Sequence, residues 1–167
     1  MNNIFDNIGK VDGICITTNG FVKSNGRCVM GRGIALSARD TFKNIDLELG
    51  KLIQKHGNIC QTIRFIKGTY LIAFPVKTAG EIMSEDTLLV NHHIGRFRPG
   101  DFVPGYALKA DLKTIERSAT QLMNMVNTCS WNKVLMTKPG CFNGGLDWDV
   151  VKPVLDTILD ERVEVIF

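Results

Sequence analysis

The chain has 167 residues, of which 44% are hydrophobic and 22% are charged. This length suits one domain with a hydrophobic core, and the near-average composition argues against a disordered, collagenous or coiled-coil protein. The 20 Lys and Arg residues against 17 Asp and Glu residues leave a net charge of +3, too small to identify a nucleic-acid binder.

Hydropathy and cysteine spacing bear on the compartment. No apolar run approaches the ~20 residues that cross a bilayer, and the N-terminal segment lacks the features of a signal peptide. The cysteines are scattered and lack CxxC spacing, which favours reduced thiols over a disulfide framework or zinc site. We therefore expect a cytoplasmic monomer that needs no membrane, metal or cofactor.

The first half of the chain alternates between β-rich and helical patterns. A short β-branched run before an Asn-Gly turn predicts a strand over residues 13–18. Apolar residues three and four positions apart predict helices over 34–43 and 45–56. Two β-rich runs, 59–66 and 69–76, are joined by a Lys-Gly dipeptide and predict a hairpin-like pair of strands.

The second half begins with the least regular segment, residues 78–108, which contains two adjacent histidines and several glycines and prolines. So long a loop in a compact domain is usually functional, a lid or mobile. The remaining patterns predict a helix, a strand, a glycine-rich loop, a helix and a strand over 109–126, 133–137, 139–148, 150–159 and 162–167. Alternating strands and helices indicate an α/β fold of three layers with a partly parallel sheet, whose ligands bind at the carboxyl ends of the strands.

Two glycine-rich segments lie where such a ligand would bind. Residues 30–33, the first glycine loop, have the sequence MGRG and precede a helix, so their backbone amides could approach an anion; an ordinary tight turn is an equal alternative. Residues 139–148, the second glycine loop, hold three glycines and an asparagine between a strand and a helix. Within it, Asp147 suits an N-cap and Trp148 suits packing of the helix. Together, the two loops predict a diphosphate gripped from both sides.

Four segments in order, TTNG, VMGRGIAL, AFPVK and PGCFNGGLDW, resemble the macrodomain family. The resemblance is strongest to the branch with terminal ADP-ribose glycohydrolases and the antitoxins that reverse ADP-ribosylation of DNA. The compact form is similar to members encoded by bacteriophages. The resemblance implies a three-layer α/β/α macrodomain over residues 1–167, with an irregular insertion at about 78–108 and with ADP-ribose as ligand.

The resemblance also assigns site residues. Lys77, in the segment Phe-Pro-Val-Lys, matches a lysine implicated in cleavage, although a solvated surface lysine is the alternative from sequence alone. The implied ligand-binding residues are Asn3, Asn19, Gly31, Gly33, Ile34, Ala35, Gly140, Cys141, Phe142, Asn143, Gly144, Gly145 and Leu146. Asn19 would lie near the distal ribose, and Asn3 aligns with an aspartate that contacts adenine.

The chain departs from the family at three positions. Gly144 stands where some glycohydrolases have a catalytic aspartate, so a Lys/Asp mechanism is not expected. Phe142 replaces a glycine and would narrow the pocket or stack on the ligand. Asn3 in place of the aspartate puts adenine recognition in doubt.

Two other candidate groups have weaker signals. The adjacent His92 and His93 favour a solvated loop pair over a metal site, because companion ligands are missing. Cys141 precedes a helix N-terminus that could lower its pKa, but we favour a packing role.

Three functions follow from the resemblance. The first is hydrolysis of ADP-ribose from a modified protein or nucleic acid, with Lys77 as nucleophile or as a stabilising charge. The second is non-catalytic binding of ADP-ribose or a related nucleotide, which the missing aspartate favours. The third is removal of phosphate from ADP-ribose 1″-phosphate.

Overall fold

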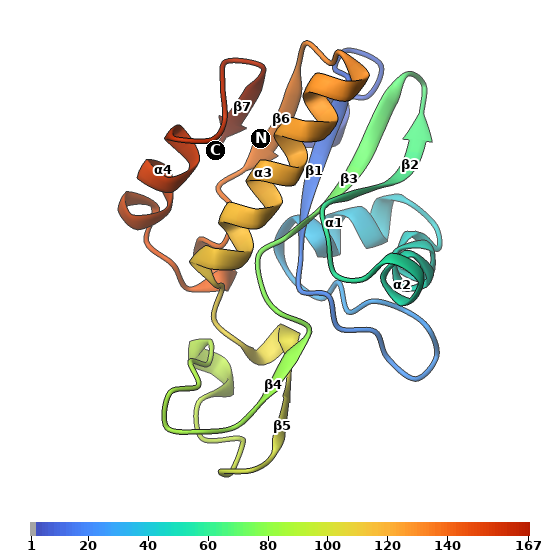
Figure 1. The fold of residues 1–167 in the computed structure, drawn as a ribbon. Helices are drawn as coiled ribbons and strands as arrows, with labels where there is room; N and C mark the ends of the chain where they lie inside the picture. The colour runs from blue at the N-terminus through green and yellow to red at the C-terminus, as the bar shows by residue number, and fades with distance from the viewer. Residues whose placement is uncertain (1–2) are drawn as a thin grey trace.

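In the computed structural model, which describes residues 3–167, five strands form one sheet in the order β2-β3-β1-β6-β7 (Figure 1). Strands β1 (Gly13–Thr18), β3 (Thr69–Pro75), β6 (Val134–Thr137) and β7 (Val163–Ile166) run parallel, and the edge strand β2 (Gln61–Ile66) is antiparallel to β3. The predicted mixed, partly parallel sheet and the hairpin are thus confirmed.

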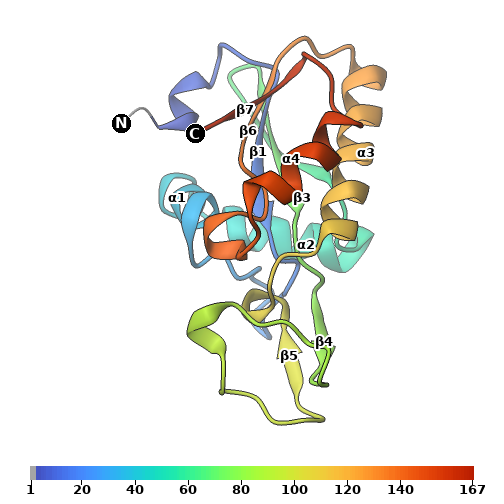
Figure 2. The same cartoon turned by 90° about the vertical axis from the view of Figure 1, so that its left-hand side faces the viewer.

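Helices cover both faces of the sheet and make three layers, with α1 and α3 on opposite sides (Figure 2). Helices α1 and α2 share one apolar cluster with the sheet, and α3 and α4 share the other. The helices are α1 (Gly33–Thr41), α2 (Ile45–His56), α3 (Leu112–Cys129) and α4 (Trp148–Asp156). None of the helices within residues 3–167 has the length and hydrophobicity to span a bilayer.

The buried strands divide their side chains between the two layers, because successive residues of a strand face opposite sides. In β1, Ile14 and Ile16 pack toward α1 and α2, whereas Cys15 packs toward α3 and α4. All three side chains are fully buried. This two-sided burial explains why β1 reads as a continuous apolar run in the sequence.

Helix α4 begins earlier than its sequence pattern predicts. Asp147 caps it, since its carboxylate accepts a hydrogen bond of 3.1 Å from the amide of Asp149. The N-cap role expected for Asp147 is therefore confirmed. Pro153 lies inside the helix, beyond its first turn, because the helix starts at Trp148.

The segment predicted as an irregular loop, residues 78–108, carries short elements of its own. Strands β4 (Gly80–Ile82) and β5 (Phe102–Pro104) pair antiparallel, and two 3-10 turns, η2 (Asn91–His93) and η3 (Gly105–Ala107), flank β5 in sequence. Buried Val103, with its neighbours, gives the segment a small apolar core. We call this segment the insertion. Three-residue strands are too short to show a periodicity, which is why the sequence pattern missed them.

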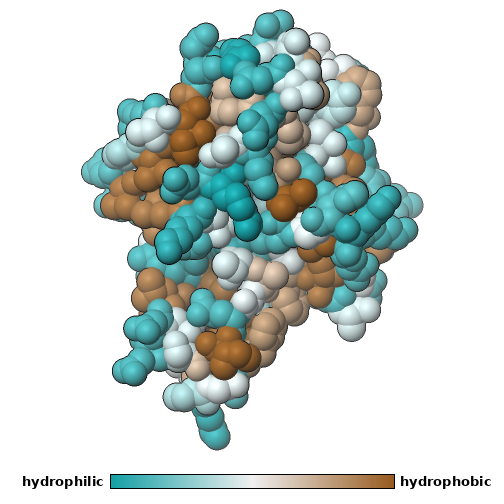
Figure 3. All heavy atoms as spheres, in the orientation of Figure 1, coloured by the Kyte–Doolittle hydropathy of each residue, from teal (hydrophilic) through white to brown (hydrophobic). Residues whose placement is uncertain are grey.

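The insertion projects from the end of the sheet at which β1 and β3 finish (Figures 1 and 2). Gly105 permits this close approach, because a Cβ atom at its position would lie 2.3 Å from the carbonyl oxygen of Thr78 and 2.6 Å from that of Asn19. Apolar side chains lie on its surface (Figure 3); Ile82, Leu88, Ile94 and Phe102 are all exposed. The insertion therefore lies beside the edge of the sheet where a ligand is expected.

Candidate functional site

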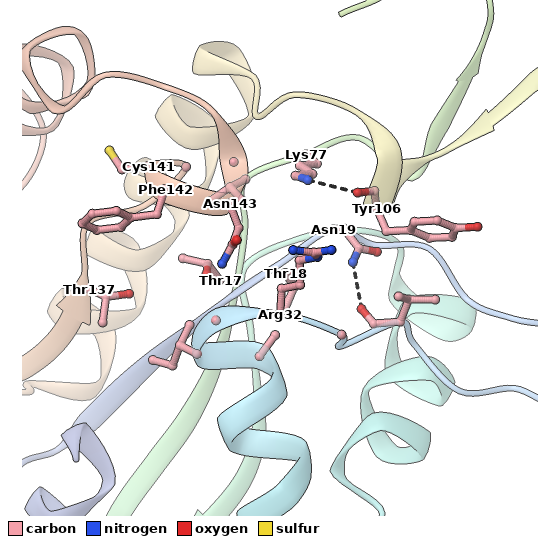
Figure 4. Close-up of a pocket in the computed structure, with 18 of the residues that line it drawn as sticks. Thr17, Thr18, Asn19, Arg32, Lys77, Tyr106, Thr137, Cys141, Phe142 and Asn143 are labelled. Atoms are coloured by element: carbon pink, nitrogen blue, oxygen red, sulfur yellow. Dashed lines mark hydrogen bonds between the residues drawn. The ribbon is translucent and has the colours of Figure 1, made fainter. Parts of the chain in front are cut away.

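A cavity of about 220 Å³ lies at the carboxyl ends of β1, β3 and β6 (Figure 4). Its walls come from both glycine loops, from the strand ends and from the insertion. Most of the residues predicted from the sequence line it: Asn19, Gly31, Gly33, Ile34, Ala35, Lys77, Gly140, Cys141, Phe142, Asn143 and Gly144. The fold thus brings together segments that are far apart in the chain.

Three predicted residues lie elsewhere. Asn3 caps the 3-10 turn η1 (Ile4–Asn7), where its Oδ1 accepts a hydrogen bond of 3.0 Å from the amide of Phe5. Leu146 packs against the core under α3 and α4. Gly145 lines a neighbouring cavity. The structure therefore does not bring Asn3, Gly145 or Leu146 to the cavity of Lys77.

The first glycine loop delivers the N-terminus of α1 to the cavity. Arg32 is the N-cap and makes no capping hydrogen bond with its side chain, so the amides of Gly33, Ile34 and Ala35 have no partner from the cap. The first turn of a helix leaves these groups free, and its dipole favours an anion. Gly33 has a φ of 57°, a conformation that glycine adopts without strain.

The second glycine loop faces the first. The amides of Gly144, Gly145 and Leu146 donate within the loop, to the carbonyls of Cys141, Phe142 and Gly140. The amides of the three residues 141–143 have no acceptor within residues 3–167. A Cβ atom on Gly33 would lie 3.1 Å from Nδ2 of Asn143, so the two loops are in contact beside the cavity.

Two side chains at the end of β1 have different roles. Asn19 accepts a hydrogen bond of 2.9 Å from the amide of Phe21 and donates one of 2.8 Å to the carbonyl of Val29, so it fastens the loop that follows β1. Thr18 is only 4% exposed and lines the cavity, but its hydroxyl oxygen is itself buried and has no hydrogen-bond partner within residues 3–167. An unpaired buried hydroxyl is unfavourable.

Lys77 follows β3 and is buried, with 8% of its surface exposed. Its Nζ donates a hydrogen bond of 3.3 Å to the carbonyl of Tyr106 in the insertion (Figure 4). Its own carbonyl accepts a hydrogen bond of 2.9 Å from Asn58. Burial, reinforced by the positive charge of Arg32, lowers the pKa of Lys77 from 10.5 to about 8. Lys77 is therefore not a solvated surface lysine.

Cationic and imidazole groups surround Lys77, and the sequence did not predict them as site residues. Arg32, His92 and His93 all line the cavity, whereas none of its lining residues is an aspartate or glutamate. Desolvation, followed by nearby positive charges, lowers the pKa of both histidines. The histidines agree with the expected solvated loop pair, since His92 is exposed and His93 half-buried, and both also line the cavity. Within residues 3–167, no group of three potential ligands gathers to hold a metal ion.

In the second glycine loop, the pKa of Cys141 and the backbone conformation of Phe142 are unusual. Burial raises the pKa of Cys141, although Lys138 opposes the shift, so the lowered pKa suggested by a helix N-terminus is wrong. Phe142 has a φ of 56° and its surface is 82% exposed. This left-handed conformation costs a non-glycine residue about 1–2 kcal/mol, which gives a physical reason for the glycine of related sequences.

The comparisons with known proteins identify the fold. No protein-family model and no curated protein matches the sequence. Among solved structures, the macrodomain of Mycobacterium tuberculosis DarG is similar with a TM-score of 0.64 and 17% identity, over 93% of this chain and 88% of that one. The macrodomain of Thermus aquaticus DarG is similar with a TM-score of 0.65 and 18% identity, over 98% and 91%.

A third similar structure is Thermosipho africanus DarTG in complex with ADP-ribose. Its TM-score is 0.64 at 14% identity; the match covers 93% of this chain but 37% of that longer one. At these low identities the likeness concerns the fold. The chain has the macrodomain fold, as the resemblance of its glycine loops implied.

Proposed function

We propose that the chain binds ADP-ribose in the cavity beside Lys77 and hydrolyses the bond that joins it to a modified protein or nucleic acid. The observation that carries this proposal is the convergence of two amide-rich loops on one buried lysine. A diphosphate suits the loops, because a helix N-terminus and free backbone amides both favour negative charge. The macrodomain fold and the ADP-ribose in one similar structure support the same ligand.

Arg32 completes the recognition of the ligand in this proposal. Arg32 projects over the cavity from the first glycine loop and supplies a permanent charge for the diphosphate (Figure 4). Contacts of the diphosphate with Arg32 and with the two glycine loops orient the distal ribose toward Lys77.

Lys77 supplies the chemistry in either of two ways. With a pKa of about 8, roughly a tenth of the lysine is the free amine at pH 7 and could attack the anomeric carbon. The protonated form would instead stabilise negative charge on the departing group. The absence of a carboxylate from the lining leaves Lys77 as the centre of the reaction.

A turnover assay tests this proposal. Wild type and Lys77→Ala are incubated with ADP-ribosylated protein and with ADP-ribosylated DNA, and released ADP-ribose is quantified. We expect Lys77→Ala to lose at least a hundredfold in rate and to keep ADP-ribose affinity within about tenfold (~1.4 kcal/mol). Lys51→Ala, on the exposed surface of α2, is the matched control and should behave as wild type.

Lys77→Arg separates the two roles of Lys77. A guanidinium stays protonated, so it cannot attack but can still stabilise charge. A rate as low as that of Lys77→Ala indicates a nucleophile, and a partly retained rate indicates a charge. Full activity in both variants would contradict any role of Lys77.

The second candidate function, a non-catalytic binder, is favoured by one observation. The lining includes no carboxylate, and Gly144 lies where some glycohydrolases have an aspartate. A binder would retain ADP-ribose affinity but release no ADP-ribose from either substrate. Release of inorganic phosphate from ADP-ribose 1″-phosphate would indicate the phosphatase instead.

A further inference from the structure

A second cavity adjoins the one that contains Lys77. Its volume is about 350 Å³, and residues 88–92 of the insertion, Lys109 and Gly145 contribute to its walls. The two cavities share three residues, His92, Phe142 and Asn143. His92 therefore lies at the junction between the cavity assigned to ADP-ribose and the neighbouring space, where the departing macromolecule would emerge.

The ring of His92 is positioned by a chain of aromatic contacts. It packs against His93 in a tilted arrangement, with ring centroids 4.4 Å apart. His93 in turn lies 5.8 Å from the ring of Tyr106 and 6.5 Å from that of Phe97. Because the carbonyl of Tyr106 accepts the hydrogen bond from Lys77, this chain ties both histidines to the lysine.

Hydrolysis at an anomeric carbon requires a group that carries protons. The attacking lysine or water must lose a proton, and an alkyl-type leaving oxygen must gain one. Arg32 stays protonated, and burial raises the pKa of Cys141, so neither exchanges a proton readily near pH 7. With no carboxylate in the lining, the imidazoles are the neutral bases beside Lys77.

Positive charges face His92 from several elements. Arg32 reaches it from the start of α1, Lys77 from the end of β3 and Arg96 from the insertion, and Lys109 shares the second cavity with it. Desolvation and the first three of these charges lower the pKa of His92 from its ordinary value, which favours the neutral ring. A neutral imidazole that lines the same cavity as Lys77 can accept a proton.

We propose that His92 carries the proton between Lys77 and the departing group. This inference rests on the proposed function. In the first step, the imidazole takes a proton from the Lys77 ammonium, the free amine bonds to the anomeric carbon, and the bond to the departing oxygen breaks. The departing oxygen keeps the electron pair and receives the proton from the imidazolium.

In the second step, water replaces the lysine. The imidazole accepts a proton from the water as its oxygen bonds to the anomeric carbon, and the bond to the lysine nitrogen breaks. The imidazolium then returns the proton to the amine. ADP-ribose and the unmodified macromolecule are the products, and both side chains regain their starting states.

Two model substrates test the role of His92. One carries an alkyl alcohol on the anomeric carbon, which must be protonated to leave; the other carries nitrophenol, which leaves as the anion. At pH 7 we expect His92→Ala to lose at least a hundredfold in kcat on the alkyl substrate. At pH 9, where Lys77 is a free amine, the first-turnover release of nitrophenol by this variant should stay within about threefold of wild type, because only the second step then needs the imidazole. His56→Ala, at the exposed end of α2, is the matched control.

Two further measurements exclude a merely structural effect. Added imidazole should restore at least a tenth of the alkyl rate to His92→Ala, because the ring is exposed and its site is open to solvent. For the wild type, kcat on the alkyl substrate should be highest at a pH between the pKa of His92 and the pKa of Lys77. It should fall above pH 8. The fall above pH 8 should be missing for the nitrophenyl substrate.

Each outcome decides the proposal. Equal losses on both substrates, or no rescue by imidazole, would overturn the proton-carrying role while the proposed hydrolysis stands. Wild-type rates on both substrates in His92→Ala and His92→Gln would do the same. A wild type that hydrolyses neither substrate, yet binds ADP-ribose, overturns the hydrolysis and this proposal with it.

Discussion

Lys77 lies in an environment that disfavours its own charge. It is buried, its one polar side-chain contact is a carbonyl, and no carboxylate pairs with it within residues 3–167. A protonated lysine in such a place reduces the stability of the folded state, because the unfolded chain solvates the ammonium freely. Groups that reduce stability in this way are common where function requires them.

Replacing the charge should therefore stabilise the protein. The shift from 10.5 to about 8 corresponds to about 3 kcal/mol, and loss of the hydrogen bond to Tyr106 offsets about 1 kcal/mol of it. We expect Lys77→Met to raise the free energy of unfolding by about 2 kcal/mol at pH 7, measured by urea denaturation. Lys51→Met, on the exposed surface, should change it by less than about 0.5 kcal/mol.

The pH dependence of this gain has a definite sign. Below pH 8 the lysine is protonated in both states, so the gain is complete. Between pH 8 and 10.5 the folded state releases its proton first, so wild-type stability rises with pH and the gain of Lys77→Met disappears. A gain that stays constant from pH 7 to 10 would show that Lys77 has an ordinary pKa.

At the scale of elements, α1 and the two glycine loops define the site. The helix begins at Gly33 with free amides, and the second glycine loop touches it from the end of β6. The construction depends on backbone groups rather than on side chains. The glycines of these loops therefore matter because they have no side chain beside the cavity. A side chain introduced at such a position should block the ligand.

Gly31 is the position at which this can be tested without strain. A Cβ atom there meets nothing closer than Cγ1 of Val29, at 4.0 Å, and its φ is not in the left-handed region. We expect Gly31→Leu to keep the wild-type melting temperature and to lose at least thirtyfold in ADP-ribose affinity. Ser24→Leu, exposed in the loop that follows β1, is the control. Wild-type affinity in Gly31→Leu would show that the ligand does not approach the first glycine loop.

The elements differ in how far the sequence predicts them. β1 and α2 have the bounds expected from it, because a buried parallel strand is apolar throughout and an amphipathic helix repeats every 3.6 residues. The insertion has no such signal, because its strands are short and its packing is with distant residues. Phe21, for example, lies 5.5 Å from the ring of Tyr106.

The residues of the site also differ in how far the sequence predicts them. The glycine loops could be predicted, because glycines before a helix have a local meaning. Arg32 and His92 could not be predicted as site residues, since their proposed roles come from the cavity that the fold creates. Asn3 lies outside the cavity and caps a 3-10 turn, which its position in the sequence could not reveal.

At the scale of the whole molecule, a small net charge conceals a local concentration of positive charge. The chain as a whole has +3, yet the cavity combines Arg32, Lys77 and Lys138 with no acidic side chain in its lining. Low-dielectric walls strengthen such a field and attract anions to the cavity. The fold thus concentrates positive charge at one cavity, and the net charge of the chain does not reveal this.

A calorimetric titration with ADP-ribose tests the central claim most directly, because every function considered requires ADP-ribose or a close relative in this cavity. We predict one binding site per chain, with ADP-ribose bound at least tenfold more tightly than AMP or ribose 5-phosphate, since each of these engages only part of the loops. Gly31→Leu should abolish the difference. No binding of ADP-ribose, or binding of AMP to wild type as tight as that of ADP-ribose, would contradict the account.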